Sequence, residues 1–237
     1  MGDDVFDELV RALEKAKEIA SEYKVRSSIP APEPPNPHDR SYRNFGDSPT
    51  ASILFMDIIG YSKLELDDDQ KAAIELLNRI VTNAIEEAEL NLHDVVCLPT
   101  GDGMCLCFTR NTEGPLKVAA GIHKALAKEN KKRKGLKIQL RMGVNLGIVH
   151  KVKDLKGADN LVGATINISQ RAMNCGDEWH ILCTEKAYDE LRKLKVYKDT
   201  FVCIEKPFKV KHEMELKLYN HVCAKGRFGN PNEPRRT

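Results

Sequence analysis

Two aspartates, Asp57 and Asp102, lie where apolar segments of the sequence meet turns that contain glycine. Asp57 follows the apolar run Ile53–Met56, and Asp102 follows Val95–Leu98 and stands between two glycines. Carboxylates at the ends of neighbouring strands suit Mg²⁺ or Mn²⁺, hard cations that prefer oxygen ligands and often bind substrate phosphates as well. The spacing alone leaves two interpretations open: a shared metal site, or two aspartates that only stabilise turns.

The residues that follow Asp57 offer further ligands for such a site. Ile58 carries a backbone carbonyl for the metal, and the amides of the turn from Ile58 through Gly60 to Tyr61 are placed to face phosphate oxygens. Ser62, which follows, is a further candidate for substrate binding. The sequence contains no GxxxxGK[ST] loop, no GxGxxG fingerprint and no HExxH motif. The usual nucleotide-hydrolase, dinucleotide and zinc-protease chemistries are therefore unsupported.

The composition is typical of a soluble globular protein, with 41% hydrophobic and 30% charged residues in 237. The net charge of +2 argues against nucleic acid as a partner. No apolar run reaches the roughly 18 residues that suggest a membrane span. Seven cysteines, an odd number mostly within apolar segments, favour a reducing compartment over a disulfide framework. We expect a cytoplasmic protein that binds neither nucleic acid nor membranes.

Apolar periodicity and proline content divide the chain into four parts. Residues 1–24 are predicted to form an amphipathic helix, which docks on the domain or pairs with a second chain. Residues 25–49 are a Pro-rich linker, and 50–223 form the compact domain. Residues 224–237 contain Gly, Pro and Arg but almost no apolar side chains, so a flexible tail is expected.

Strand and helix patterns alternate within the compact domain. Strands are predicted at 51–58, 94–100, 104–108, within 136–150, at 179–183, and as two strands before residue 223; helices are predicted at 67–90, 115–131, 164–174 and 185–193. Residues 154–163 are expected to be a polar loop.

The order of these elements, with a hairpin between the first two helices, predicts an α+β fold. Its core is a ferredoxin-like β-α-β-β-α-β unit, in which helices cover one face of a mostly antiparallel sheet. Gly143 and Gly147 suggest a bend or bulge in their strand.

Several segments together resemble the class III nucleotidyl cyclases. Phe55–Ser62 resembles that family's F-x-D-I-x-G-[FY]-[ST] signature, and Thr100–Gly103 looks like its second metal-binding turn. Gly163–Arg171 resembles its G-x-x-x-N-x-x-x-R segment, and Lys211 falls where the family has a phosphate-binding lysine. The resemblance runs in order along the domain, from about Ala51 to Cys223.

The resemblance implies a two-metal reaction on a nucleoside triphosphate. Asp57 and Asp102, with the Ile58 carbonyl, would hold two divalent ions, Mn²⁺ or Mg²⁺. The ribose 3′-hydroxyl would then attack the α-phosphate, giving a 3′,5′-cyclic nucleotide and pyrophosphate.

The resemblance also assigns the residues that contact the rest of the substrate. Asn167 would orient the ribose, Arg171 would neutralise charge at the α-phosphate, and Lys211 would hold the terminal phosphates. Asn167 and Arg171 are four residues apart, so they share a helix face and can reach one ligand. In this family they face the metal aspartates of the other subunit, which implies a head-to-tail homodimer with shared sites.

The positions that read the base in purine cyclases are Leu98 and Asn160 in this sequence. Adenylate enzymes use Lys with Asp or Thr there, and guanylate enzymes use Glu with Cys or a similar residue. Leu98 has no hydrogen-bonding group, and Asn160 can both donate and accept. The purine determinants are therefore missing.

A chain without an attached sensor and without these determinants resembles the bacterial pyrimidine cyclases of antiphage (Pycsar-type) defence. UTP is expected ahead of CTP, and a downstream effector would be reached only through the cyclic nucleotide. The alternatives are an adenylate or guanylate cyclase with an atypical pocket, an inactive nucleotide-binding homologue, and a dimerisation module led by the N-terminal helix.

Overall fold

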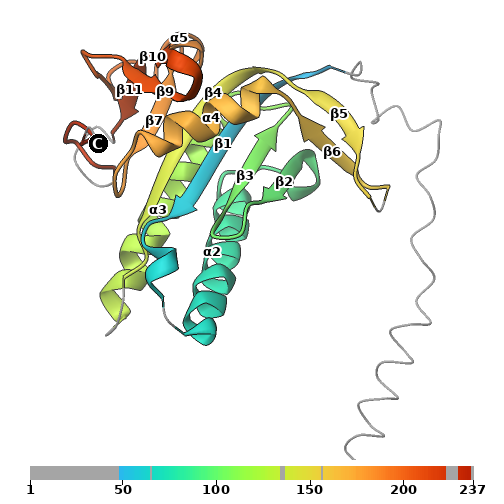
Figure 1. The fold of residues 1–237 in the computed structure, drawn as a ribbon, viewed down its shortest axis with the longest axis vertical. Helices are drawn as coiled ribbons and strands as arrows, with labels where there is room; N and C mark the ends of the chain where they lie inside the picture. Colours follow the sequence, from blue (N-terminus) through green and yellow to red (C-terminus); the bar gives the residue numbers. More distant parts are fainter. Residues whose placement is uncertain (1–47, 65, 134–136, 156, 223–228, 236–237) are drawn as a thin grey trace, which may run out of the picture. The chain divides into compact units, whose positions relative to one another are not determined.

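The computed structural model describes residues 48–64, 66–133, 137–155, 157–222 and 229–235 (Figure 1). All of them belong to the unit Phe45–Thr237, one of the two into which the chain divides. The predicted N-terminal helix (1–24), and the linker (25–49) up to residue 47, lie outside the described residues.

A seven-stranded sheet in the order β2-β3-β1-β4-β7-β11-β8 forms the centre of this unit. Its strands are β1 (Thr50–Ile58), β2 (Val95–Pro99), β3 (Gly103–Phe108), β4 (Leu140–Ile148), β7 (Ile181–Thr184), β8 (Phe201–Cys203) and β11 (Leu218–His221). β4 and β7 are parallel, and the other neighbouring strands are antiparallel. The predicted α+β fold with a mostly antiparallel sheet is confirmed.

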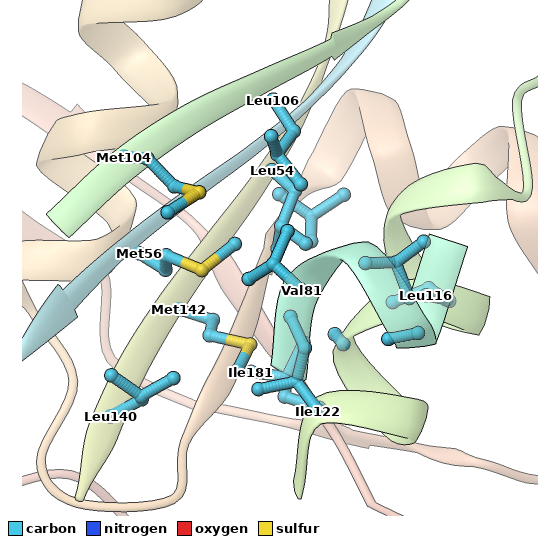
Figure 2. Close-up of a cluster of buried hydrophobic side chains, with 14 of the residues drawn as sticks. Leu54, Met56, Val81, Met104, Leu106, Leu116, Ile122, Leu140, Met142 and Ile181 are labelled. Atoms are coloured by element: carbon cyan, nitrogen blue, oxygen red, sulfur yellow. The ribbon is translucent and has the colours of Figure 1, made fainter. Parts of the chain in front are cut away.

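Two long helices, α2 (Asp67–Glu87) and α3 (Gly114–Lys132), cover one face of the sheet. Side chains of a strand alternate between the two faces, so Leu54 and Met56 of β1 and Met142 of β4 enter the same core. Figure 2 shows these side chains together with Val81 of α2 and Ile122 of α3. All five residues belong to the main hydrophobic core.

The helix α4 (Ala164–Asn174) packs on the other face, so the prediction that all helices cover one face is wrong. Gly143 permits this close packing, because a Cβ there would lie 2.2 Å from the Ser169 carbonyl oxygen. The Ser169 hydroxyl also donates to the Gly143 carbonyl at 2.8 Å. A bulge at Gly143 or Gly147 is not found, since the register between β1 and β4 is continuous.

A hairpin of β5 (His150–Lys153) and β6 (Asp159–Val162) replaces part of the predicted polar loop 154–163. Its side chains are mostly exposed, which hides the strand pattern in the sequence, but Leu161 is buried. The hairpin extends away from the main sheet in Figure 1.

The C-terminal part of the domain holds more strands than expected. After α5 (Glu185–Leu191) come β8 and a two-stranded sheet of β9 (Phe208–Val210) and β10 (Met214–Leu216), followed by β11. Lys217 separates β10 from β11. The described residues also contain the short 3₁₀ helices η1 (Tyr61–Lys63), η2 (Leu92–Asp94) and η3 (Lys211–Glu213).

Of the predicted flexible tail (224–237), residues 229–235 are held in place by hydrogen bonds, and residues 224–228 and 236–237 lie outside the described residues. Asn230 donates its backbone amide to the Trp179 carbonyl at 2.9 Å, and Pro234 is buried. The segment is held by hydrogen bonds rather than by apolar side chains, so its low apolar content was misleading. Within the described part of the chain, no helix is both long and apolar enough to span a bilayer.

Candidate active site

The pairing of three strands brings the two predicted metal aspartates together. Asp57, next to the end of β1, lies opposite Gly103 of β3 and Arg141 of β4. The Ile58 amide donates to the Asp102 carbonyl at 3.1 Å, which holds the β2–β3 turn against the end of β1. Asp57 and Asp102 line one cavity of about 280 Å³.

Gly103 makes this close approach of β3 to β1 feasible. A Cβ at this position would lie 2.0 Å from the Met56 carbonyl oxygen and 2.9 Å from the Asp57 Cα. No non-glycine residue fits at that distance without displacing one of the strands. The glycine after Asp102 is therefore a packing requirement of the site.

Arg141 forms an ion pair with Asp57 that the sequence analysis missed. Its Nη2 and Nε donate to Asp57 Oδ2 at 2.8 and 3.2 Å. Burial raises the pKa of the Asp57 carboxyl above its usual value; Arg141 opposes this shift, and Asp102 adds to it. Asp57 and Arg141 are 84 positions apart in the chain. The sequence could have indicated this ion pair only if the pairing register of β1 and β4 had been known.

Two carboxylates so close to one another fit a divalent cation. Positive charge between them would relieve their repulsion, and Arg141 occupies only one of the two Asp57 oxygens. In the described ranges no group of three or more His, Cys, Asp or Glu is arranged to hold a metal. The donor set therefore suits a cation such as Mg²⁺, which keeps water ligands and shares its shell with substrate phosphates.

The turn after β1 offers fewer amides to a phosphate than the sequence suggested. The Ile58 amide is bound to Asp102, and the Ile59 amide donates to the Gln139 carbonyl at 2.9 Å. An amide role for Ile58 toward substrate is therefore wrong, while its carbonyl remains a predicted metal ligand. Gly60 (φ 75°) turns the chain into η1, so Gly60, Tyr61 and Ser62 line the cavity.

The remaining predicted substrate-binding residues lie outside the cavity that holds the aspartates: Asn167, Arg171 and Lys211. Asn167 is exposed on α4, and Arg171 reaches Met214 of β10 with 3.5 Å between Nη1 and Sδ. Lys211 is exposed in η3, which joins β9 to β10. The β9–β10 hairpin packs against α4, so these three residues belong to one region.

The two predicted base-reading positions lie on strands that contact one another, β2 and β6. Leu98 is half-buried and packs against the apolar cluster that contains Leu161. The Asn160 Oδ1 accepts a hydrogen bond from the Leu161 amide at 2.7 Å. No hydrogen bond of its Nδ2 to another described residue is found, so its side chain presents a donor.

Three further charged residues line the aspartate cavity and were not predicted: Asp177, Glu178 and Arg235. Arg235 belongs to the segment that was expected to fray. Its Nε donates to Asp177 Oδ1 at 3.0 Å, and its Nη2 donates to Glu178 Oε2 at 2.9 Å. No local sequence pattern joins residues so far apart in the chain.

Comparison with known proteins identifies what this chain is similar to. The family model "Adenylate and Guanylate cyclase catalytic domain" matches residues 45–221. No curated protein matches the chain.

Solved cyclase structures share the fold. The guanylate cyclase domain of RhGC from Catenaria anguillulae, in complex with GTP, has a TM-score of 0.60 at 19% identity, covering 75% of this chain and 98% of that one. The adenylyl cyclase CyaB from P. aeruginosa has a TM-score of 0.61 at 16% identity, covering 77% and 98%. The Adenylate/Guanylate Cyclase/Hydrolase from Silicibacter pomeroyi has a TM-score of 0.58 at 21% identity, covering 75% and 98%.

Proposed function

Because this chain belongs to the adenylate and guanylate cyclase catalytic domain family, we propose that it converts a pyrimidine nucleoside triphosphate to a 3′,5′-cyclic nucleotide and pyrophosphate. UTP is the preferred substrate and CTP the second. The observation that carries the proposal is the cavity that combines Asp57, Asp102 and the turn from Gly60 to Ser62.

The residues around this cavity bind the two metals and the phosphates. Asp57 and Asp102, with the Ile58 carbonyl, hold two divalent ions, Mn²⁺ or Mg²⁺. When bound, these ions favour ionisation of the ribose 3′-hydroxyl and neutralise the leaving pyrophosphate. Gly60, Tyr61 and Ser62 donate amides to the phosphates. Arg141, already at Asp57, adds a positive charge beside them.

The remaining groups come from a second copy of the chain in a head-to-tail homodimer. Asn167 orients the ribose, Arg171 stabilises charge at the α-phosphate, and Lys211 binds the terminal phosphates. This arrangement is supported by the position of these residues outside the Asp57 cavity and by the exposure of Asn167 and Lys211.

The β5–β6 hairpin supplies exposed apolar area for such a contact. Apolar side chains that are exposed on it and at the end of β4 include Ile148, Val152, Leu155 and Val162. Exposed apolar side chains gathered on one projection are typical of a protein–protein contact. They favour a second chain as the partner of this surface.

The hydrogen-bonding state of Asn160 supports UTP over CTP. Its Oδ1 is occupied by the Leu161 amide, so Nδ2 is the group left to meet a base. The O4 atom of uracil is an acceptor, whereas the N4 amino group of cytosine is a donor and would oppose Nδ2. Leu98 adds apolar surface and has no hydrogen-bonding group that a base would have to satisfy. A guanine O6 would also accept from Nδ2, so a guanylate cyclase with an atypical base pocket is the alternative to a pyrimidine cyclase.

We place this reaction in the cytoplasm, as part of antiphage defence. Each described cysteine is a free thiol, which suits a reducing compartment. The cyclic nucleotide would reach a downstream effector by diffusion, without direct contact between effector and cyclase.

Incubation with each of the four nucleoside triphosphates and Mn²⁺, followed by identification of products, tests the function. We expect 3′,5′-cyclic UMP as the main product and less cyclic CMP, with neither formed by the Asp57→Ala variant. Cyclic GMP or cyclic AMP as the main product would refute the pyrimidine assignment. The absence of every cyclic product would refute the enzyme assignment.

A further inference from the structure

The segment Gly229–Arg235, here called the C-terminal strap, ends at the wall of the aspartate cavity. It starts at a left-handed glycine, Gly229 (φ 88°), and crosses the turn that precedes β7. Asn220 Nδ2 donates to the Asn230 carbonyl at 2.6 Å, and Asn230 Nδ2 donates to the Glu178 carbonyl at 3.0 Å. The strap is thus fixed to β11 on one side and to the turn on the other.

The buried His180 connects the same turn to the strap. Its Nδ1 accepts a hydrogen bond from the Asp177 amide at 2.9 Å, so in the neutral ring the proton is on Nε2. That Nε2 donates to the Asn232 carbonyl at 2.9 Å. The ring therefore fixes the distance between the strap and the turn that carries Asp177 and Glu178.

The turn itself has a strained backbone. Trp179 has φ 67°, a left-handed conformation that is strained for a bulky residue. It persists because the Trp179 amide donates to Leu140 at 2.8 Å, its carbonyl accepts from Asn230, and its ring packs on His123. The surrounding contacts thus hold two carboxylates, Asp177 and Glu178, at the cavity wall.

Those two carboxylates are unfavourable for a substrate that carries a triphosphate. The cavity is lined by four carboxylates and two guanidinium groups: Asp57, Asp102, Asp177, Glu178, Arg141 and Arg235. Two carboxylates are assigned to metal ions, and Arg141 is paired with Asp57. Arg235 is therefore the cation that faces the remaining two.

The Arg235 ion pairs contribute little to folding stability. Its side chain is 71% exposed, and ion pairs at such exposed sites add little to stability because water screens them. Their charge nevertheless acts on any anion in the cavity. Three donors meet the two carboxylates, because the Arg235 backbone amide also donates to Asp177 Oδ2 at 2.8 Å.

We propose that the C-terminal strap is part of the substrate site, in which Arg235 neutralises Asp177 and Glu178 and so admits the triphosphate. Arg235 is a positioning residue for phosphate binding and makes no contact with the reacting atoms. The proposal rests on the proposed function, because it assumes that the cavity binds phosphates.

Calorimetric titration with inorganic tripolyphosphate and Mg²⁺ tests the proposal without turnover and without a base. We expect Arg235→Ala to weaken binding about fivefold, the effect of one unit charge acting across several Å of partly exposed protein. Arg235→Lys retains most of the affinity. The difference between Arg235→Ala and wild type shrinks at high salt, because exposed charges are screened.

A rescue experiment separates charge neutralisation from simple anchoring. Adding Asp177→Asn and Glu178→Gln to Arg235→Ala should restore wild-type affinity, because the repelling charges are removed. Arg192→Ala is the matched control: Arg192 pairs with Asp189 at 3.1 Å outside the cavity, and its loss should leave binding unchanged.

Three outcomes would overturn the proposal: unchanged affinity in Arg235→Ala, no rescue by the amide variants, or no binding of tripolyphosphate by wild type. If wild type binds tripolyphosphate and the rescue succeeds but no cyclic nucleotide is made, the proposed function fails and this inference stands. If wild type makes cyclic nucleotide but Arg235→Ala binds normally, only this inference fails.

Discussion

At the scale of single residues, the site depends on which atoms are already committed within the protein. Asp57 shares Oδ2 with Arg141, and the Ile58 amide is bound to Asp102. Asn160 has its acceptor bound to the following amide and presents a donor. Residue type alone does not reveal these states, which decide what each group can offer to a ligand.

Replacing Asn160 by aspartate should reverse its preference for a base. The carboxylate presents an acceptor where Nδ2 presented a donor, so cytosine N4 becomes the better partner. We expect the ratio of UTP to CTP turnover to fall about tenfold or more, since one hydrogen bond is worth about 1–1.5 kcal/mol and an unpaired group costs more. Competition assays with equal concentrations of both nucleotides measure the ratio.

Asp159→Asn is the control for the charge of the hairpin. Neighbouring side chains of a strand point to opposite faces, so Asp159 does not share the face of Asn160. It pairs instead with Lys153 at 2.7 Å. An unchanged ratio in Asn160→Asp would show that Asn160 does not contact the base.

At the scale of elements, glycines set how closely strands and helices approach. Gly103 lets β3 approach β1, which places Asp102 beside Asp57. Gly143 lets α4 approach β4, which positions the helix that carries Asn167 and Arg171. Each part of the proposed active centre therefore depends on one glycine, because a Cβ at that position would prevent the close approach.

Gly103→Ala should destabilise the fold and disrupt the metal pair together. The added methyl overlaps the Met56 carbonyl, and such overpacking typically costs about 1–3 kcal/mol. We expect a lower midpoint in urea denaturation. We also expect weaker Mn²⁺ binding, measured by titration without urea, where the variant is still folded.

Gly101→Ala separates backbone strain from steric overlap. Gly101 has φ 91°, but a Cβ there meets nothing within 4 Å. The Gly101→Ala variant should lose stability through backbone strain alone and should keep the β1–β3 pairing. Equal Mn²⁺ binding in Gly103→Ala and wild type would contradict the role assigned to Gly103.

Sequence reasoning located the elements and residues that local patterns define. Asp57 and Asp102 stand at the ends of clear apolar runs, so both were predicted. Arg141 was missed because its role depends on the β1–β4 register, which no local pattern encodes. The C-terminal strap was missed because hydrogen bonds, not apolar side chains, hold it in place. The β5–β6 hairpin was missed because most of its side chains are exposed.

At the scale of the whole molecule, the proposed function assigns one chain two incomplete halves of an active centre. Asp57 and Asp102 lie with the phosphate-facing turn, while Asn167, Arg171 and Lys211 lie together elsewhere. A head-to-tail dimer of such chains would create two complete centres, each with one half from either chain. On this proposal, catalysis requires the dimer.

Mixing Asp57→Ala and Arg171→Ala chains, each inactive alone, tests this account most directly. After exchange of subunits, about a quarter of wild-type activity should return, because half of the dimers are mixed and each mixed dimer has one intact centre. A mixture of Asp57→Ala with Asp102→Ala is the control and should stay inactive, since every centre in it lacks a metal aspartate. Recovery in the first mixture alone is the predicted result; no recovery despite demonstrated exchange would contradict the shared active centre.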